Sequence, residues 1–173
     1  MIRLDWLNSL SEEAASIELL KCCGSQKWAR RMGSSRPIGS FEELIQKADT
    51  IWLHLDRDDW LEAFRSHPKI GENKAAAKVS TQSEGWSGQE QAGIHGAATQ
   101  TLDELAKLNR EYEEKFGFIF IVCATGKASE EMLAILKTRI GNDLETELPI
   151  AAREQAKITK IRLGKLLSRR SGT

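Results

Sequence analysis

Helical periodicity with few interruptions is the feature that most limits what this chain can fold into. Only three of the 173 residues are proline, and apolar residues recur at the three- and four-residue spacing of buried helix faces. The clearest example carries Phe41, Leu44, Ile45, Ala48, Ile51 and Trp52. We therefore predict an all-α fold, organised as one compact multi-helix domain over residues 1–173, because typical domains hold about 100–200 residues.

Serine residues mark several predicted helix starts. Ser11 precedes two glutamates, Ser25 opens a short segment, and Ser40 with Glu43 forms a capping box. Ser87 with Glu90 has the same capping-box spacing. The resulting predicted helices cover about 11–24, 25–32, 40–52, 58–65, 87–115 (with possible breaks at Gly93 and Gly96), 129–140 and 143–167.

Two segments do not fit the helical pattern. Residues 118–124 form a short apolar run with strand-like composition, but no second strand is available to pair with it. We predict a short buried extended segment there. Residues 70–86 are polar and irregular, and we interpret them as a connection, of which 72–85 could act as a lid.

Charge and cysteine content indicate the compartment and exclude some partners. Lys and Arg number 25, as do Asp and Glu, so the net charge is zero and neither nucleic acid nor an anionic membrane is expected as a partner. Cys22, Cys23 and Cys123 lack the spacing of a disulfide framework or a zinc site. With no recognisable signal peptide or C-terminal address, we predict free thiols, no metal and a cytoplasmic location.

His67 is the first candidate for chemistry. It follows a predicted helix end and lies between Ser66 and Pro68. A helix C-terminus raises the basicity of an imidazole, and the proline restricts the backbone beside it. The alternative is that this sequence simply stops a helix. His54 and His95 do not lie beside a proline at a predicted helix end, and we interpret them as structural.

The other candidates are polar residues at helix positions. Ser87, Glu90 and Gln91 could cap a helix, or they could form an amide-rich helix start that holds an oxyanion or a urea-like group. Arg162, in a strongly apolar stretch, could bind a carboxylate with its planar fork. It could equally be a solvated charge near a helix C-terminus.

Four ordered motifs resemble the OHCU decarboxylase family, whose substrate is 2-oxo-4-hydroxy-4-carboxy-5-ureidoimidazoline, a late intermediate of urate breakdown. The motifs are SHPKIG at 66–71, WSGQEQAG at 86–93, LNREYEEKFGFIFIVCATGK at 108–127 and EQAKITKIRL at 154–163. The Leu7-Asn8 opening and the Arg36-Pro37 loop add to the resemblance, which spans essentially the whole chain.

This resemblance implies an all-helical, cofactor-free homodimer that converts OHCU to (S)-allantoin and CO2. It implies His67, Glu90 and Arg162 as catalytic residues. The implied substrate-binding residues are Pro68, Ser87, Gln91, Arg162 and the backbone of Ile119, Phe120 and Ile121. Lys69 stands where the family often has arginine, a mild departure. The lack of a peroxisomal ending fits a bacterial, cytoplasmic version.

The reaction that the resemblance implies can proceed with amino-acid side chains alone. The carbon that loses CO2 is bonded to a ring C=N carbon, so an electron pair can be accepted without metal, thiamine or pyridoxal. Two other functions remain as alternatives. One is a non-catalytic helical module that binds a ureide or a protein, and the other is a helical nucleic-acid binder that uses the basic C-terminal helix.

Overall fold

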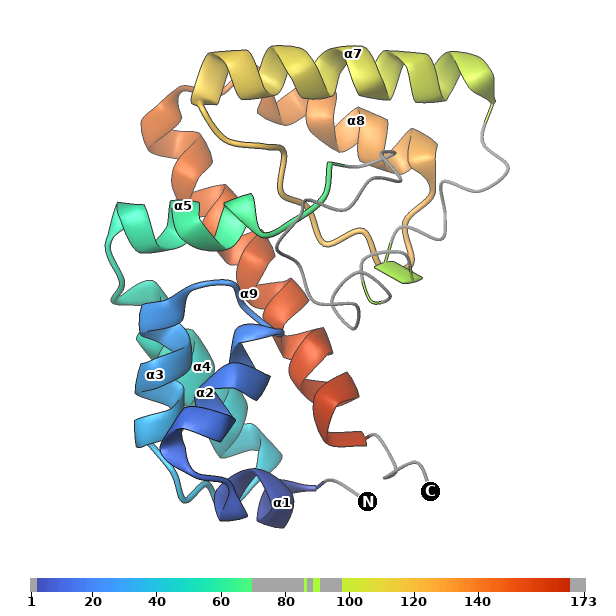
Figure 1. Ribbon diagram of the computed structural model, residues 1–173. Helices are drawn as coiled ribbons and strands as arrows, with labels where there is room; N and C mark the ends of the chain where they lie inside the picture. The colour runs from blue at the N-terminus through green and yellow to red at the C-terminus, as the bar shows by residue number, and fades with distance from the viewer. Residues whose placement is uncertain (1–2, 70–85, 87–88, 91–97, 169–173) are drawn as a thin grey trace. The chain divides into compact units, whose positions relative to one another are not determined.

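The computed structural model describes residues 3–69, 86, 89–90 and 98–168, and every regular element within these residues is a helix. This confirms the predicted all-α class. The elements are α1 (Leu4–Ser9), α2 (Glu12–Leu20), α3 (Gln26–Ser34), α4 (Phe41–Leu53), α5 (Arg57–Arg65), α7 (Thr99–Phe116), α8 (Ser129–Arg139) and α9 (Leu144–Ser168) (Figure 1). None of the described helices has the length and apolarity needed to cross a membrane.

The described residues divide into two compact units. The first contains residues 3–63 and 156–168, and the second contains residues 64–69, 86, 89–90 and 98–155. The boundaries fall inside α5 and α9, so each of these helices contributes residues to both units. The single domain over 1–173 therefore stays a prediction.

Serine caps begin three helices of the first unit, as their sequence signals predict. The hydroxyls of Ser11, Ser25 and Ser40 accept hydrogen bonds from the N–H groups of Ala14, Trp28 and Glu43. Each bond satisfies one of the N–H groups that a helix start leaves without an intrahelical partner. α1 has no such cap and was not predicted.

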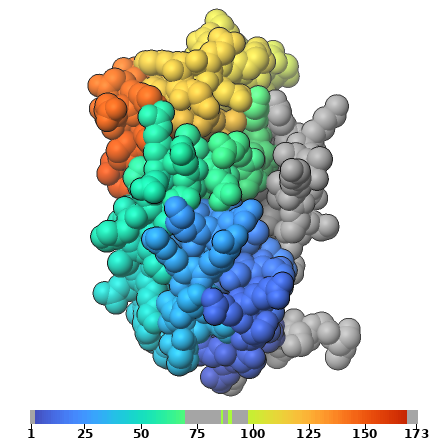
Figure 2. Space-filling model, turned by 60° about the vertical axis from the view of Figure 1, so that its left-hand side comes forward, coloured from blue at the N-terminus to red at the C-terminus, as the bar shows by residue number. Residues whose placement is uncertain are grey.

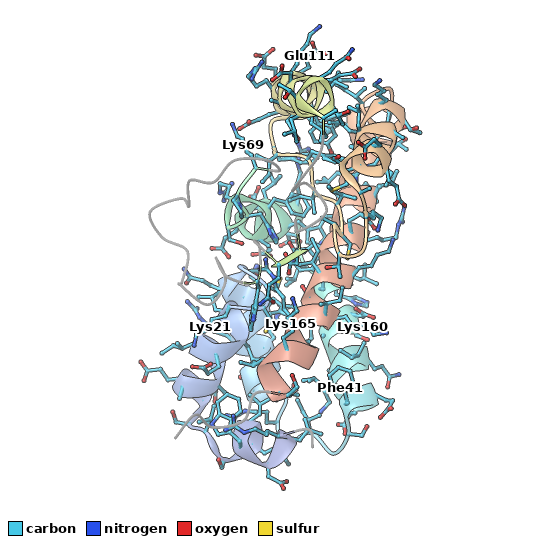
Figure 3. All side chains as sticks on the ribbon, turned by 90° about the vertical axis from the view of Figure 1, so that its right-hand side faces the viewer. Lys21, Phe41, Lys69, Glu111, Lys160 and Lys165 are labelled. Atoms are coloured by element: carbon cyan, nitrogen blue, oxygen red, sulfur yellow. The ribbon has the colours of Figure 1, made fainter. Side chains whose placement is uncertain are left out.

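The first unit has its core between α2, α3, α4 and the second half of α9. Trp28 is fully buried, and its indole N–H donates to the Ala48 carbonyl at 3.1 Å. Phe41 lies beside the last turns of α9 (Figure 3), where a Cβ added at Gly164 would stand 3.8 Å from its Cζ. Gly164 therefore leaves room for the aromatic ring.

The chain opening is fixed to the Arg36-Pro37 loop. Arg36 Nη1 donates to the Leu7 and Leu10 carbonyls at 2.6 and 2.8 Å. Asn8 Nδ2 donates to the Ile38 carbonyl at 2.8 Å, and Asn8 Oδ1 accepts from the Ile38 N–H at 2.9 Å. These contacts explain why α1 forms without a cap, since tertiary bonds hold its ends.

α2 and α3 border a groove on the surface of the first unit. Figure 2 shows both helices, in blue, on the face that it presents. The groove has a volume of about 490 Å³ and is lined by Glu12, Glu13, Ser16, Ile17, Leu20, Gln26, Ala29 and Arg30. Ile17 is 57 % exposed, so α2 presents an apolar side chain at this edge.

In the second unit, α7 and α8 pack together and the buried segment 118–124 follows α7 (Figure 1). Gly117, with φ +79°, ends α7 in the left-handed conformation that glycine adopts readily. Tyr112 then packs against Phe116, Phe118 and Phe120, with ring centroids 4.6–5.8 Å apart. The alternate phenylalanines thus attach the extended segment to α7.

Side chains, rather than a neighbouring strand, bind the backbone of this segment. Arg139 Nη1 donates to the Ile121 carbonyl at 2.6 Å, and the Cys123 N–H donates to Glu154 Oε1 at 3.3 Å. Lys127 Nζ donates to the Cys123 carbonyl at 2.8 Å. The predicted buried extended segment is confirmed, and these bonds show how its backbone groups are satisfied outside a sheet.

Two sequence-based interpretations fall on residues outside the described part of the chain. The connection predicted over 70–86, including the proposed lid at 72–85, lies there except for Trp86, where the prediction is wrong because this residue is helical and buried. So do Gly93 and Gly96, the possible breaks in the helix predicted over 87–115. Trp86, just before that range, and Gln89 and Glu90 within it are helical, and α7 begins at Thr99 after Ala98, which makes no side-chain cap.

Candidate active site

His67 lies directly after α5, in the second unit. Its N–H donates to the Phe64 carbonyl at 3.2 Å, which tightens the turn that leaves the helix. Its ring Nε2 lies 2.6 Å from Gln155 Oε1 of α9. His67 therefore ends the helix through its backbone, and its ring is held in place by Gln155. Pro68, the next residue, is half-buried.

Two adjacent residues of α9 connect this imidazole to the extended segment. Gln155, which is fully buried, bonds to His67, and Glu154 accepts the Cys123 N–H. Both residues belong to the motif at 154–163, and no role was predicted for either of them. Their burial indicates a role, because polar groups in a protein interior need hydrogen-bond partners.

Glu90 joins the same unit as a buried carboxylate, with 7 % of its surface exposed. Burial raises the pKa of the Cys123 thiol, and the carboxylates of Glu154 and Glu90 raise it further. Both carboxylates therefore act on the end of the extended segment. The thiol stays protonated at neutral pH, so Cys123 is a poor nucleophile.

The backbone of Ile119, Phe120 and Ile121 lies in the extended segment, with Ile119 half-buried and the other two buried. The Ile121 carbonyl accepts from Arg139. No described residue accepts a hydrogen bond from the N–H groups of these three residues. The segment thus keeps amide donors that are not used by the described part of the fold.

Arg162 belongs to the first unit and is only 3 % exposed. The interpretation of this residue as a solvated helix charge is therefore wrong. Its positive charge lowers the pKa of Cys22 and Cys23, but burial dominates and raises both. A buried guanidinium in this position can bind an anion or carbonyl with two parallel N–H donors.

Ser87 and Gln91 lie outside the described residues. Lys69 Nζ pairs with Glu113 Oε2 of α7 at 2.7 Å; Figure 3 labels Lys69. Within the described residues, no group of three or more His, Cys, Asp or Glu side chains is arranged to hold a metal ion.

Comparison with known proteins identifies the family. The family model described as OHCU decarboxylase matches residues 8–164. A crystal structure of OHCU decarboxylase in the presence of (S)-allantoin superposes with a TM-score of 0.74 and 40% identity, covering 88% of this chain and 98% of that one. This chain therefore belongs to the OHCU decarboxylase family.

Some curated relatives are much longer than this chain, and others are of similar length. The uric acid degradation bifunctional protein TTL of Arabidopsis thaliana is 40% identical over 92% of this chain. The 2-oxo-4-hydroxy-4-carboxy-5-ureidoimidazoline decarboxylase of Haloferax volcanii is 26% identical over 81% of this chain and 80% of its own length. The chain spans 49%, 34% and 32% of the lengths of three bifunctional relatives.

Proposed function

We propose that this chain decarboxylates OHCU to (S)-allantoin and CO2, as a carboxy-lyase of urate degradation. The observation that carries the proposal is the His67 imidazole, fixed by buried Gln155 in the unit that also buries Glu90. This arrangement occurs in a chain whose family match extends over residues 8–164. It supplies a group that can move a proton and a carboxylate that can bind N–H groups.

The reaction needs an electron acceptor and a directed proton. As the carboxylate carbon leaves as CO2, the bonding electrons move towards the adjacent ring C=N. The ring nitrogen of that C=N gains a proton, the hydroxyl on the decarboxylating carbon loses its proton to form the carbonyl, and the neighbouring carbon gains one proton on one face. The net change is uptake of one proton and release of CO2, which amino-acid side chains can assist without a cofactor.

Each predicted site residue has a role in this proposal. His67 interacts with the substrate hydroxyl or carboxylate and moves its proton during C–C cleavage. Arg162 binds substrate oxygens, while Glu90 and Gln91 hold ureido and ring N–H groups. Ser87 adds a hydrogen bond. Pro68 shapes the site, and the amides of Ile119, Phe120 and Ile121 provide backbone contacts.

We further propose a cytoplasmic homodimer with a small ureide as its substrate. The three cysteines, free and buried, support a reducing compartment. Homodimer formation rests on the family resemblance, and the exposed Ile17 and Leu20 of α2 supply apolar surface of the kind that contacts between copies bury. Light scattering should give twice the chain mass of 19.4 kDa.

The decisive assay generates OHCU enzymatically from urate and follows chiral allantoin by circular dichroism. We expect the protein to accelerate both the loss of OHCU and the gain of the (S)-allantoin signal. A ureide- or protein-binding module would leave OHCU decay at its spontaneous rate and would yield racemic product. A nucleic-acid binder would instead show salt-sensitive DNA affinity.

Three substitutions with matched controls test the roles. His67→Asn should reduce kcat by about 10²–10⁴-fold, the usual contribution of a positioned acid or base. Glu90→Gln and Arg162→Lys should weaken binding of substrate and transition state. His54→Asn, Glu111→Gln and Arg110→Lys make the same chemical changes at exposed positions and should have little effect.

A further inference from the structure

The hydrogen bond between His67 and Gln155 constrains both the orientation of the His67 ring and the position of its proton. Nε2 of the imidazole and Oε1 of the carboxamide are 2.6 Å apart, and the two residues are 88 positions apart in the chain. Gln155 is fully buried and belongs to a helix of 25 residues. Its side chain is therefore held by the surrounding core before any substrate binds.

The chemistry of this contact decides where the imidazole carries its proton. A carboxamide oxygen can only accept, so Nε2 must donate and must carry the hydrogen. In the neutral ring, the lone pair then lies on Nδ1. A hydrogen bond on one ring nitrogen thus sets both the tautomer and the orientation of the ring, as second-shell partners of histidine ligands do.

We infer that Gln155 is a positioning residue for His67, holding the ring in the Nε2–H tautomer so that His67 acts on the substrate through Nδ1. The inference rests on the proposed function, in which His67 moves a proton. A neutral amide suits this task, because it orients the ring without adding the negative charge that would favour the imidazolium form.

Charged groups of the second unit lie on the segment of His67 and on the elements that follow it. They include Lys69 on the same segment, Glu113 on α7, Glu154 next to Gln155 on α9, and buried Glu90. Lys69 pairs with Glu113 at 2.7 Å, and Glu154 accepts the Cys123 N–H. Gln155→Met leaves these four side chains unchanged, and Gln155→Glu adds one charge at the position that contacts His67.

The first experiment replaces the neutral acceptor by a charged one. In Gln155→Glu, we expect the pKa of His67, measured by NMR titration of its ring signals, to rise by about one unit or more. The acidic limb of the kcat/KM profile should move to higher pH by the same amount. His54 and His95 serve as internal references, and His67→Asn assigns the signals.

A matched control separates this contact from general charge effects. Gln100→Glu adds the same charge at an exposed position of α7 in the same unit, and it should leave the His67 titration unchanged. If Gln155→Glu also leaves the pKa of His67 and the acidic limb unchanged, the inference is wrong.

The second experiment removes the acceptor. Gln155→Met keeps much of the side-chain volume, and we expect kcat to fall by about 10–100-fold while KM changes little, because positioning acts on the chemical step. The ring 15N shifts of His67 should report a changed tautomer population. Wild-type kcat in folded Gln155→Met protein would overturn the inference.

The titration also distinguishes this inference from the proposed function, because it needs no substrate. If the wild-type protein did not turn over OHCU, the proposed function would fail, while the NMR measurements would still decide whether Gln155 controls the protonation of His67.

Discussion

Arg139 and Glu147 form a buried ion pair beneath the extended segment, with Arg139 Nη2 2.5 Å from Glu147 Oε1 and side-chain exposures of 7% and 0%. The same guanidinium donates from Nη1 to the Ile121 carbonyl and lies 4.7 Å from the centroid of the Phe120 ring. Tyr112 donates its hydroxyl proton to Glu147 Oε1 at 2.5 Å. The pair therefore connects α7, α8 and α9 to the backbone of the proposed substrate contacts.

Replacing Arg139 should strongly destabilise the folded protein. In Arg139→Met, Glu147 would keep a buried charge without its guanidinium partner, and we expect the free energy of unfolding to fall by about 3–5 kcal/mol. Urea denaturation followed by far-UV circular dichroism measures this. Lys137→Met removes an exposed charge from the same helix and should change stability by at most about 1 kcal/mol. Equal effects of the two substitutions would argue against the buried pair as a stabilising element.

The buried thiols should resist labelling in the folded protein. Burial raises the pKa of Cys23 to about 12 and that of Cys22 further still, so very little reactive thiolate exists at pH 8. We expect slow reaction with a thiol reagent in buffer and complete reaction in concentrated urea. Rapid native labelling of Cys22 or Cys23 would contradict the described core.

The same thiols should make stability fall at alkaline pH. Above the ordinary thiol pKa of about 8.5, the unfolded chain releases these protons while the folded chain retains them. The unfolded state then binds fewer protons, so the free energy of unfolding decreases as pH rises. Cys22→Ala should make this decrease less steep between pH 8 and 10. An unchanged slope would count against the raised pKa.

The start of α4 offers a local test of the sequence signals. Ser40→Ala removes the hydroxyl that accepts the Glu43 N–H at 3.0 Å, and we expect a loss of about 1 kcal/mol in unfolding free energy. Thr50→Ala, at an exposed position of the same helix, should stay within about 0.5 kcal/mol. Thermal denaturation of both variants provides the comparison.

Local signals predicted much of the helical fold. Ser11, Ser25 and Ser40 each cap a helix at the predicted place, since a side-chain oxygen and the N–H that it accepts are only three residues apart. α1 was missed because Arg3 provides no cap and the helix is fixed by long-range bonds. Arg36 is one such partner, and its position in space cannot be deduced from local pattern.

The candidate site was predicted through residue types and family resemblance, while its supporting contacts were not. Nothing in the local sequence indicates that Gln155 meets His67, because 88 residues separate them. The sequence position of Arg139, at the end of a helix, likewise predicts a solvated charge. Its burial depends on packing between elements. Arg162 is buried in the first unit, and its interpretation as a solvated charge proved wrong for the same reason.

The most direct test of the central claim is the rate at which OHCU disappears, with (S)-allantoin detected by circular dichroism, for the wild-type chain, His67→Asn and His54→Asn. We expect strong acceleration and (S)-product with the wild type and His54→Asn, and a loss of about 10²–10⁴-fold in kcat with His67→Asn. Spontaneous decay to racemic product with the wild-type chain, or full activity in folded His67→Asn, would contradict it.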